Sequence, residues 1–199
     1  MDLPDTRNSL LLEVRDLKNR QAWEEFSAIY RPVIFRLAQF KGLQTQDAED
    51  LTQQVLINVA RAINGWEPDP DKAKFRTWLR RVADNAILNA LTRQRPDKAA
   101  GGEVSQSILA EYPTSSDDSK LLQIEYRRAV FALVAKQIRP EFSDETWAAF
   151  WKTTVDEIDI DDVAKELGRT RGSVYAARSR VMKRLRSKVE EYDASDHRP

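Results

Sequence analysis

Cysteine is absent from this chain of 199 residues, and histidine occurs once, as His197. The absence of cysteine excludes a disulfide framework, a thiol nucleophile and cysteine-based zinc or iron–sulfur sites. A single histidine near the end of the chain makes a catalytic triad or a histidine general base difficult to assemble. The nucleotide-binding patterns GxxxxGK[ST] and GxGxxG are missing as well. We therefore expect a protein that is not an enzyme and that needs no cofactor.

Long apolar runs are also missing, since none approaches the roughly 20 residues that span a bilayer. The first residues lack the basic segment, apolar stretch and cleavage site of a signal peptide. The composition is 41% hydrophobic and 32% charged, which suits a folded core under a strongly solvated surface. The sequence therefore predicts a globular cytoplasmic protein without a membrane partner.

The chain has no net charge, because 32 Lys plus Arg balance 32 Asp plus Glu, but the charges are separated along it. Every charged residue from 169 to 188 is basic, whereas the segment 156–166 is acidic apart from Lys165. A second basic region covers residues 72–95, with Asp84 as its only internal acid. Two separate basic regions indicate two contacts with a polyanion.

Apolar residues recur with helical periodicity throughout, and no stretch alternates with period two. The expected fold is all-α, with Pro32 kinking or interrupting one helix and Thr45 as the N-cap of another. Pro140 and Ser143 mark a break and a restart in the second half of the chain. Helices are expected at 9–17, 21–40, 45–65, 75–93, 121–138, after 143, 161–167 and 170–189.

The segment RPDKAAGGEVSQSILAEYPTSSDDSK is rich in Gly, Ser, Asp and Pro and lacks apolar periodicity. Such a composition is typical of a flexible linker. We therefore expect two small helical domains, residues 1–96 and 121–199, joined by a linker at 97–120.

The segment IDIDDVAKELGRTRGSVYAARSRVMKRLRSK has the spacing of a helix-turn-helix. Its first helix stops at Gly168, which can adopt the left-handed conformation, and the second begins after Thr170. Small Ala164 suits the close crossing of the two helices. The apolar, inward face of the second helix is expected at Val174, Ala177, Val181 and Leu185. Its outward face carries small, hydrogen-bonding and cationic side chains that suit a DNA major groove: Arg171, Ser173, Tyr175, Ala176, Ser179, Arg180 and Lys183. A solvated basic helix in an ordinary bundle is the alternative.

Polar residues four positions apart form a stripe along the helix predicted at 75–93: Thr77, Arg81, Asn85, Asn89 and Arg93. Amides flanked by arginines can contact base edges and phosphates, and Phe75 could stack on an unpaired base. The alternative is a plain solvated face. For Trp66 and Trp78 core packing is favoured.

The helix predicted at 45–65 has an apolar core stripe and a second, exposed side with amides, one acid and one apolar residue: Asp50, Gln53, Gln54, Ile57 and Arg61. Such a mixture favours docking on a partner protein. Asp47, Glu49 and Asp50 could also be Mg²⁺ ligands. Carboxylates in a first helical turn are, however, favoured by the helix dipole alone, so no metal site is expected.

Three segments in order resemble the extracytoplasmic-function (ECF) type of RNA polymerase sigma factor, the minimal branch of the sigma-70 family. DAEDLTQQVLINVARAI is similar to region 2.2 of that family, and FRTWLRRVADNAILNALTRQRP to regions 2.3 and 2.4. DDVAKELGRTRGSVYAARSRVMKRLR is similar to region 4.2. The resemblance covers nearly the whole chain and implies a factor that binds core polymerase, selects promoters and opens DNA.

The resemblance implies roles for three groups of residues. Docking on the clamp coiled coil of the polymerase β′ subunit falls to Asp50, Leu51, Gln53, Gln54 and Ile57, with Gln54 where the family usually has Glu. Capture of the minus-ten strand falls to Lys74, Phe75, Arg76, Arg81, Asn85, Asn89 and Arg93. Recognition of the minus-35 duplex falls to Arg171, Ser173, Tyr175, Ala176, Ser179, Arg180 and Lys183. An anti-sigma factor is a further candidate partner.

Two other functions are consistent with part of the sequence. A dimeric helix-turn-helix repressor would account for the C-terminal motif but not for the docking side of the helix at 45–65. A degenerate sigma-like adaptor would bind polymerase or a regulator without starting transcription.

Overall fold

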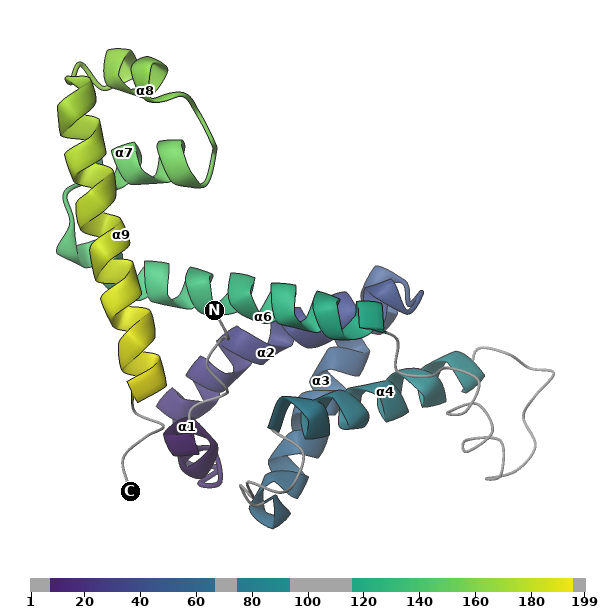
Figure 1. Ribbon diagram of the computed structural model, residues 1–199. Helices are drawn as coiled ribbons and strands as arrows, with labels where there is room; N and C mark the ends of the chain where they lie inside the picture. The colour runs from purple at the N-terminus through teal and green to yellow at the C-terminus, as the bar shows by residue number, and fades with distance from the viewer. Residues whose placement is uncertain (1–7, 67–74, 94–115, 195–199) are drawn as a thin grey trace. The chain divides into compact units, whose positions relative to one another are not determined.

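The structure, a computed structural model, describes residues 8–66, 75–93 and 116–194 (Figure 1). All regular structure in these ranges is helical, and the all-α fold class is confirmed. The chain divides into two compact units, Met1–Val130 (unit 1) and Phe131–Pro199 (unit 2). Each unit is described by itself below.

Unit 1 is built around α2 (Arg20–Phe40), α3 (Thr45–Ala62) and α4 (Phe75–Arg93). A short α1 (Asn8–Glu13) precedes them, and the 3-10 turn η1 (Ile63–Gly65) follows α3. Helix α3 packs against both α2 and α4, so it lies at the centre of the unit (Figure 1).

Helix α2 buries one apolar face, whose members recur at three- and four-residue intervals: Phe26, Ile29, Tyr30, Val33, Ile34 and Leu37. Its N-cap, Asn19, accepts a hydrogen bond from the Ala22 N–H at 3.1 Å. Pro32 lies inside the helix with an exposed side chain, and α2 continues to Phe40. Interruption, one of the two outcomes expected for Pro32, is therefore excluded, because packing of the opposite face holds the helix together past the missing N–H donor.

Helix α3 begins one position earlier than the capping prediction placed it. The Ala48 N–H donates to the Gln44 carbonyl at 2.8 Å, so Gln44 is the N-cap and Thr45 is already helical. The prediction that Thr45 caps the helix is wrong, since a favourable side chain does not decide where the first backbone hydrogen bond forms. The predicted core stripe is confirmed as buried: Leu51, Val55, Val59 and Ile63.

Helix α6 (Ser116–Ile138) runs across the boundary between the units. Most of the predicted linker, residues 97–115, lies outside the described residues, while its last part, 116–120, is helical and belongs to α6. The assignment of one functional domain to residues 1–96 and another to residues 121–199 stays a prediction.

Unit 2 continues through η3 (Arg139–Glu141), α7 (Asp144–Thr154), α8 (Ile160–Glu166) and α9 (Arg171–Ala194). The break expected at Pro140 is confirmed, because Pro140 lies in η3. The restart after Ser143 is confirmed too, since the Ser143 side chain accepts a hydrogen bond from the Thr146 N–H at 3.3 Å and caps α7.

The turn between α8 and α9 depends on the backbone conformation of Gly168, whose φ is +60°. This left-handed conformation ends α8, as predicted. Thr170 then caps α9, because its Oγ1 accepts a hydrogen bond from the Ser173 N–H at 3.2 Å. Together, α7, α8 and α9 enclose a small apolar core of Ala149, Val163, Ala164, Val174 and Ala177.

Among the described residues, no helix is both long and apolar enough to cross a lipid bilayer.

Replacing Gly168 by Ala should destabilise the protein by about 1–2 kcal/mol, the cost of holding a residue with a Cβ in the left-handed conformation. An added Cβ would meet no atom within 4 Å, so the whole cost is backbone strain. Gly172→Ala is the matched control: it lies inside α9, and alanine there should stabilise by about 0.4–1 kcal/mol. Urea denaturation of the full chain measures both, and equal effects would exclude a conformational role for Gly168.

Candidate nucleic-acid interface

The rotation of α9 about its axis separates a buried face from an exposed one. Val174, Ala177, Val181 and Leu185 are buried, as predicted. The residues expected to face a DNA groove are all exposed to solvent: Arg171, Ser173, Tyr175, Ala176, Ser179, Arg180 and Lys183. The structure therefore brings these seven side chains to the part of α9 that is turned away from the core of unit 2.

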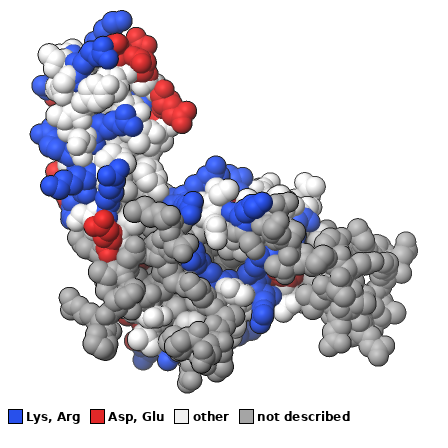
Figure 2. Space-filling view, viewed as in Figure 1, with Lys and Arg blue, Asp and Glu red and all other residues white. Residues whose placement is uncertain are grey.

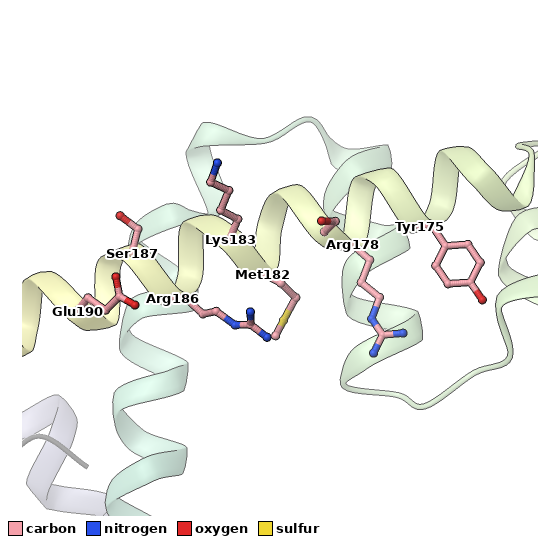
Figure 3. Close-up of a pocket in the computed structure, with 8 residues that line it drawn as sticks. Tyr175, Arg178, Met182, Lys183, Arg186, Ser187 and Glu190 are labelled. Atoms are coloured by element: carbon pink, nitrogen blue, oxygen red, sulfur yellow. The ribbon is translucent and has the colours of Figure 1, made fainter. Parts of the chain in front are cut away.

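A hollow runs along α9 and extends beyond the predicted residues (Figure 3). Its lining combines cationic, hydroxyl and apolar side chains with one acid, Glu190: Tyr175, Arg178, Ser179, Met182, Lys183, Arg186, Ser187 and Glu190. Figure 2 shows Lys and Arg side chains distributed along α9. Arg178 and Arg186 were counted in the basic segment but not among the groove-facing residues. The absence of acids from 169 to 188 was the signal that could have included them.

Ion pairs join η3, α7, α8, α9 and the turn before α9 within unit 2. Arg184 Nε lies 2.6 Å from Glu141 Oε2, and Lys152 Nζ lies 2.8 Å from Glu166 Oε1. Arg169 pairs with Glu145 in the same way. Exposed ion pairs contribute at most about 1 kcal/mol each. Within the acidic segment 156–166, Glu166 is thus paired with a lysine of α7, at little gain in stability.

The polar stripe of α4 is exposed where its side chains are described: Thr77, Arg81, Asn85 and Asn89. Arg93 is the last residue of α4, and its side chain lies outside the described part, as does the whole of Lys74. The stripe predicted from four-residue spacing is therefore present on one helix as far as Asn89.

Phe75, expected to be open to an unpaired base, is instead part of the core of unit 1. Its side chain is only 3% exposed. Its ring centroid lies 5.9 Å from that of Phe26, 5.7 Å from Tyr30, 5.3 Å from Trp66 and 5.4 Å from Trp78. The contacts with Phe26, Tyr30 and Trp66 are edge-to-face, and aromatic contacts of this kind stabilise a core. The base-stacking assignment for Phe75 is corrected. Trp66 and Trp78, for which core packing is favoured, contact the Phe75 ring but are half-buried.

The arginines of α4 have different surroundings. The Arg76 guanidinium lies over the Tyr126 ring, 4.7 Å from its centroid, and is half-buried. Arg80 is 7% exposed, and its Nε lies 3.4 Å from Asp84 Oδ2. Among the α4 arginines whose side chains are described, only Arg81 is exposed. The second basic region is thus less cationic at its surface than its composition suggests, because Arg80 is inside the fold.

The predicted docking side of α3 presents five exposed side chains: Asp50, Gln53, Gln54, Ile57 and Arg61. Ile57 is 46% exposed and supplies apolar area on this side of the helix. Gln54 Nε2 donates to Asn58 Oδ1 at 3.0 Å. Leu51, assigned to the same contact, is 6% exposed and packs in the core. Its assignment as a direct contact is corrected, since a buried side chain can only support the exposed ones.

The acids at the start of α3 do not form a metal centre in the structure. Within residues 8–66, 75–93 and 116–194, no three acid or histidine side chains lie close enough together to hold a metal ion. The position of Asp47 in the first turn is accounted for by the positive end of the helix dipole.

The class that these features define is an all-helical protein with exposed amides and an arginine on α4 and exposed cationic side chains on α9. Comparison with known proteins agrees with this class. The Sigma-70 region 2 family matches residues 28–96, a segment that contains most of α2 and all of α3 and α4.

Relatives match a larger share of the chain. ECF RNA polymerase sigma factor SigE of Mycolicibacterium smegmatis is 25% identical over 87% of this chain and 63% of its own length. SigM of Mycobacterium tuberculosis, also an ECF RNA polymerase sigma factor, is 25% identical over 89% of this chain and 82% of its own. The chain therefore spans less than two thirds of the first relative's length. Residues 28–96 thus match the Sigma-70 region 2 family, and most of the chain is similar to ECF RNA polymerase sigma factors.

Phe75→Ala should lower the free energy of unfolding of the protein by about 3–5 kcal/mol, the usual cost of removing a buried aromatic ring. Phe40→Ala is the matched control, because Phe40 is 56% exposed and its loss should cost far less. Denaturant unfolding followed by circular dichroism measures the difference. Equal stability of the two variants would contradict the core position of Phe75.

Proposed function

We propose that this chain is a sigma factor that binds core RNA polymerase, directs it to promoters and helps to open the DNA for transcription initiation. The observation that carries the proposal is the pair of exposed faces on α4 and α9, together with the region 2 match that contains α3 and α4. No bond is made or broken by the chain itself in this function. Its place of action is the cytoplasm, where polymerase and DNA are found.

The exposed side of α3 docks on the clamp coiled coil of the β′ subunit. Asp50, Gln53 and Gln54 supply polar contacts, and Ile57 supplies apolar area at the centre of the face. Leu51 supports this face from within the core. An apolar residue surrounded by amides and one acid is well suited to such a contact, since burial of Ile57 drives association and the polar groups define the orientation.

The exposed stripe of α4 binds the non-template strand of the minus-ten element. Asn85 and Asn89 have amides that can pair with the edges of unstacked bases, and Arg81 can hold a phosphate. Unstacking costs a few kcal/mol per step, and binding of the extruded bases offsets this cost. Lys74, Arg76 and Arg93 complete the proposed site.

The α8–turn–α9 segment acts as a helix-turn-helix that binds the minus-35 duplex. The N-terminal half of α9 enters the major groove, where its hydroxyl, small and cationic side chains contact base edges and phosphates. The two units would thus hold two separate promoter elements. An anti-sigma factor that masks one of these faces would be a natural regulator.

The repressor and adaptor functions make different predictions. A repressor needs no docking face on α3 and no contact with polymerase. An adaptor binds polymerase but does not start transcription. Reconstituted transcription with core polymerase and a library of promoters decides among the three, because only a sigma factor yields promoter-dependent transcripts.

The combined change Asp50→Ala and Gln53→Ala should weaken association with core polymerase by about tenfold or more, since interface residues at the centre of a contact often contribute more than 1 kcal/mol each. The matched control is Gln21→Ala with Glu24→Ala, which removes an exposed amide and acid at the same spacing from α2. Fluorescence titration with labelled protein measures both affinities. Wild-type affinity of the α3 variant would refute the docking face.

Arg180→Ala should weaken binding to a promoter duplex, and the slope of log affinity against log salt concentration should fall by about one if Arg180 neutralises a phosphate. Arg127→Ala is the control, because this exposed arginine of α6 lies outside the proposed contacts. Anisotropy titrations between low and moderate salt measure the slope. Unchanged affinity at every salt concentration would remove Arg180 from the interface.

A further inference from the structure

The first residue of α9, Arg171, is paired with the first turn of α8. Its Nε lies 2.9 Å from Oδ1 of Asp161. The side chains of Arg171 and Asp161 are 63% and 46% exposed, and ion pairs this exposed add little to stability. The pair therefore needs an explanation other than holding the two helices together, which the apolar core around Val163 and Val174 already does.

Both partners stand on backbone that is itself fixed by hydrogen bonds. The Asp161 N–H donates to the Asp159 side chain at 2.7 Å, which caps α8. At the start of α9, Thr170 Oγ1 accepts from the Ser173 N–H. An ion pair between side chains on two fixed backbone segments favours the side-chain directions that keep the two charges close. Asp161 therefore limits where the Arg171 guanidinium can point.

Pairing through Nε leaves the far edge of the guanidinium, with its two terminal nitrogens, open. No other partner of Arg171 is found within the described part of the chain. Two parallel donors at this edge match the O6 and N7 acceptors of guanine in the major groove, which is the commonest specific contact of arginine with DNA. A guanidinium without such a holder would equally well bind any phosphate as a flexible cation.

We infer that Asp161 is a positioning residue that holds Arg171 as a preformed bidentate donor for one guanine of the upstream promoter duplex. The inference rests on the proposed contact of α9 with that duplex. Asp161 does not touch DNA; it acts by fixing Arg171 and by placing a carboxylate where a phosphate would otherwise be attracted. Asp161 is thus a determinant of sequence preference rather than of affinity.

This role differs from a plain charge effect in a measurable way. If Asp161 only repelled DNA, its neutralisation would raise affinity for all duplexes alike and leave the preference for guanine unchanged. If it positions Arg171, its neutralisation lowers the preference at a single base pair while other positions keep theirs. The quantity to measure is therefore the preference at each position, not the overall affinity.

The test uses the full-length chain with core RNA polymerase and a duplex library randomised across the upstream element, with bound sequences counted after selection. The variants are Asp161→Asn, Arg171→Lys and the control Asp162→Asn. Asp162 is the best control, since it also lies in the first turn of α8 and, in the part of the chain that the structure describes, pairs with Lys165 of its own helix at 3.6 Å. Thermal unfolding of the two asparagine variants measures how much stability each loses when a carboxylate is removed from the first turn of α8. The two losses should be similar.

We expect Asp161→Asn to reduce the preference for guanine at one position by about fivefold or more, and Arg171→Lys to reduce it at the same position. Asp162→Asn should keep every preference. A wild-type preference for guanine that survives Asp161→Asn, or that does not depend on Arg171, would overturn the inference while leaving the sigma function intact. A wild-type holoenzyme that selects no sequence at all would instead overturn the proposed function together with it.

Discussion

The rotation of α9 about its axis is the constraint from which the proposed duplex contact follows. Val174, Ala177, Val181 and Leu185 have to be buried, and a helix has only one orientation that buries all four. The residues between them are then exposed or half-buried. Full burial of a valine or leucine side chain stabilises the fold by roughly 1.5–3 kcal/mol, more than any exposed ion pair of the unit. Packing thus determines which face of α9 is buried. The ion pairs with α7 and α8 affect only the positions of individual side chains.

In unit 1 the aromatic cluster around Phe75 fixes the orientation of α4, as the aliphatic face fixes that of α9 in unit 2. It joins the beginning of α4 to α2 and to the end of η1 through rings that meet edge to face. The direction in which α4 leaves this cluster decides which of its polar residues reach solvent. Arg80 and Arg81 are neighbours in sequence, yet one is buried beside Asp84 and the other is exposed. Two adjacent residues of α4 therefore differ in role: Arg80 belongs to the core, and Arg81 belongs to the proposed contact with the DNA strand.

The sequence predicted the helices and their inward faces well, because periodic burial of apolar residues is a local property that spacing reveals. The turn at Gly168 was predictable for the same reason, since few residues adopt its conformation easily. The misassigned residues share another feature. Phe75 and Leu51 occupy positions that a family resemblance links to function, and only tertiary packing shows that their side chains are inside. The pair of Asp161 with Arg171 could not be predicted either, because it depends on how two helices cross.

The exposed face of α9 contributes almost nothing to the core beneath it. Substitutions at Tyr175, Ala176 or Ser179 therefore leave folding nearly untouched, and under the proposed function they change which DNA is bound. Gene duplication followed by drift at such positions could redirect a copy to other genes without an intermediate that fails to fold. In evolutionary terms, regulatory circuits built on this scaffold can diversify through a few surface mutations, and folding stability places little restraint on their divergence.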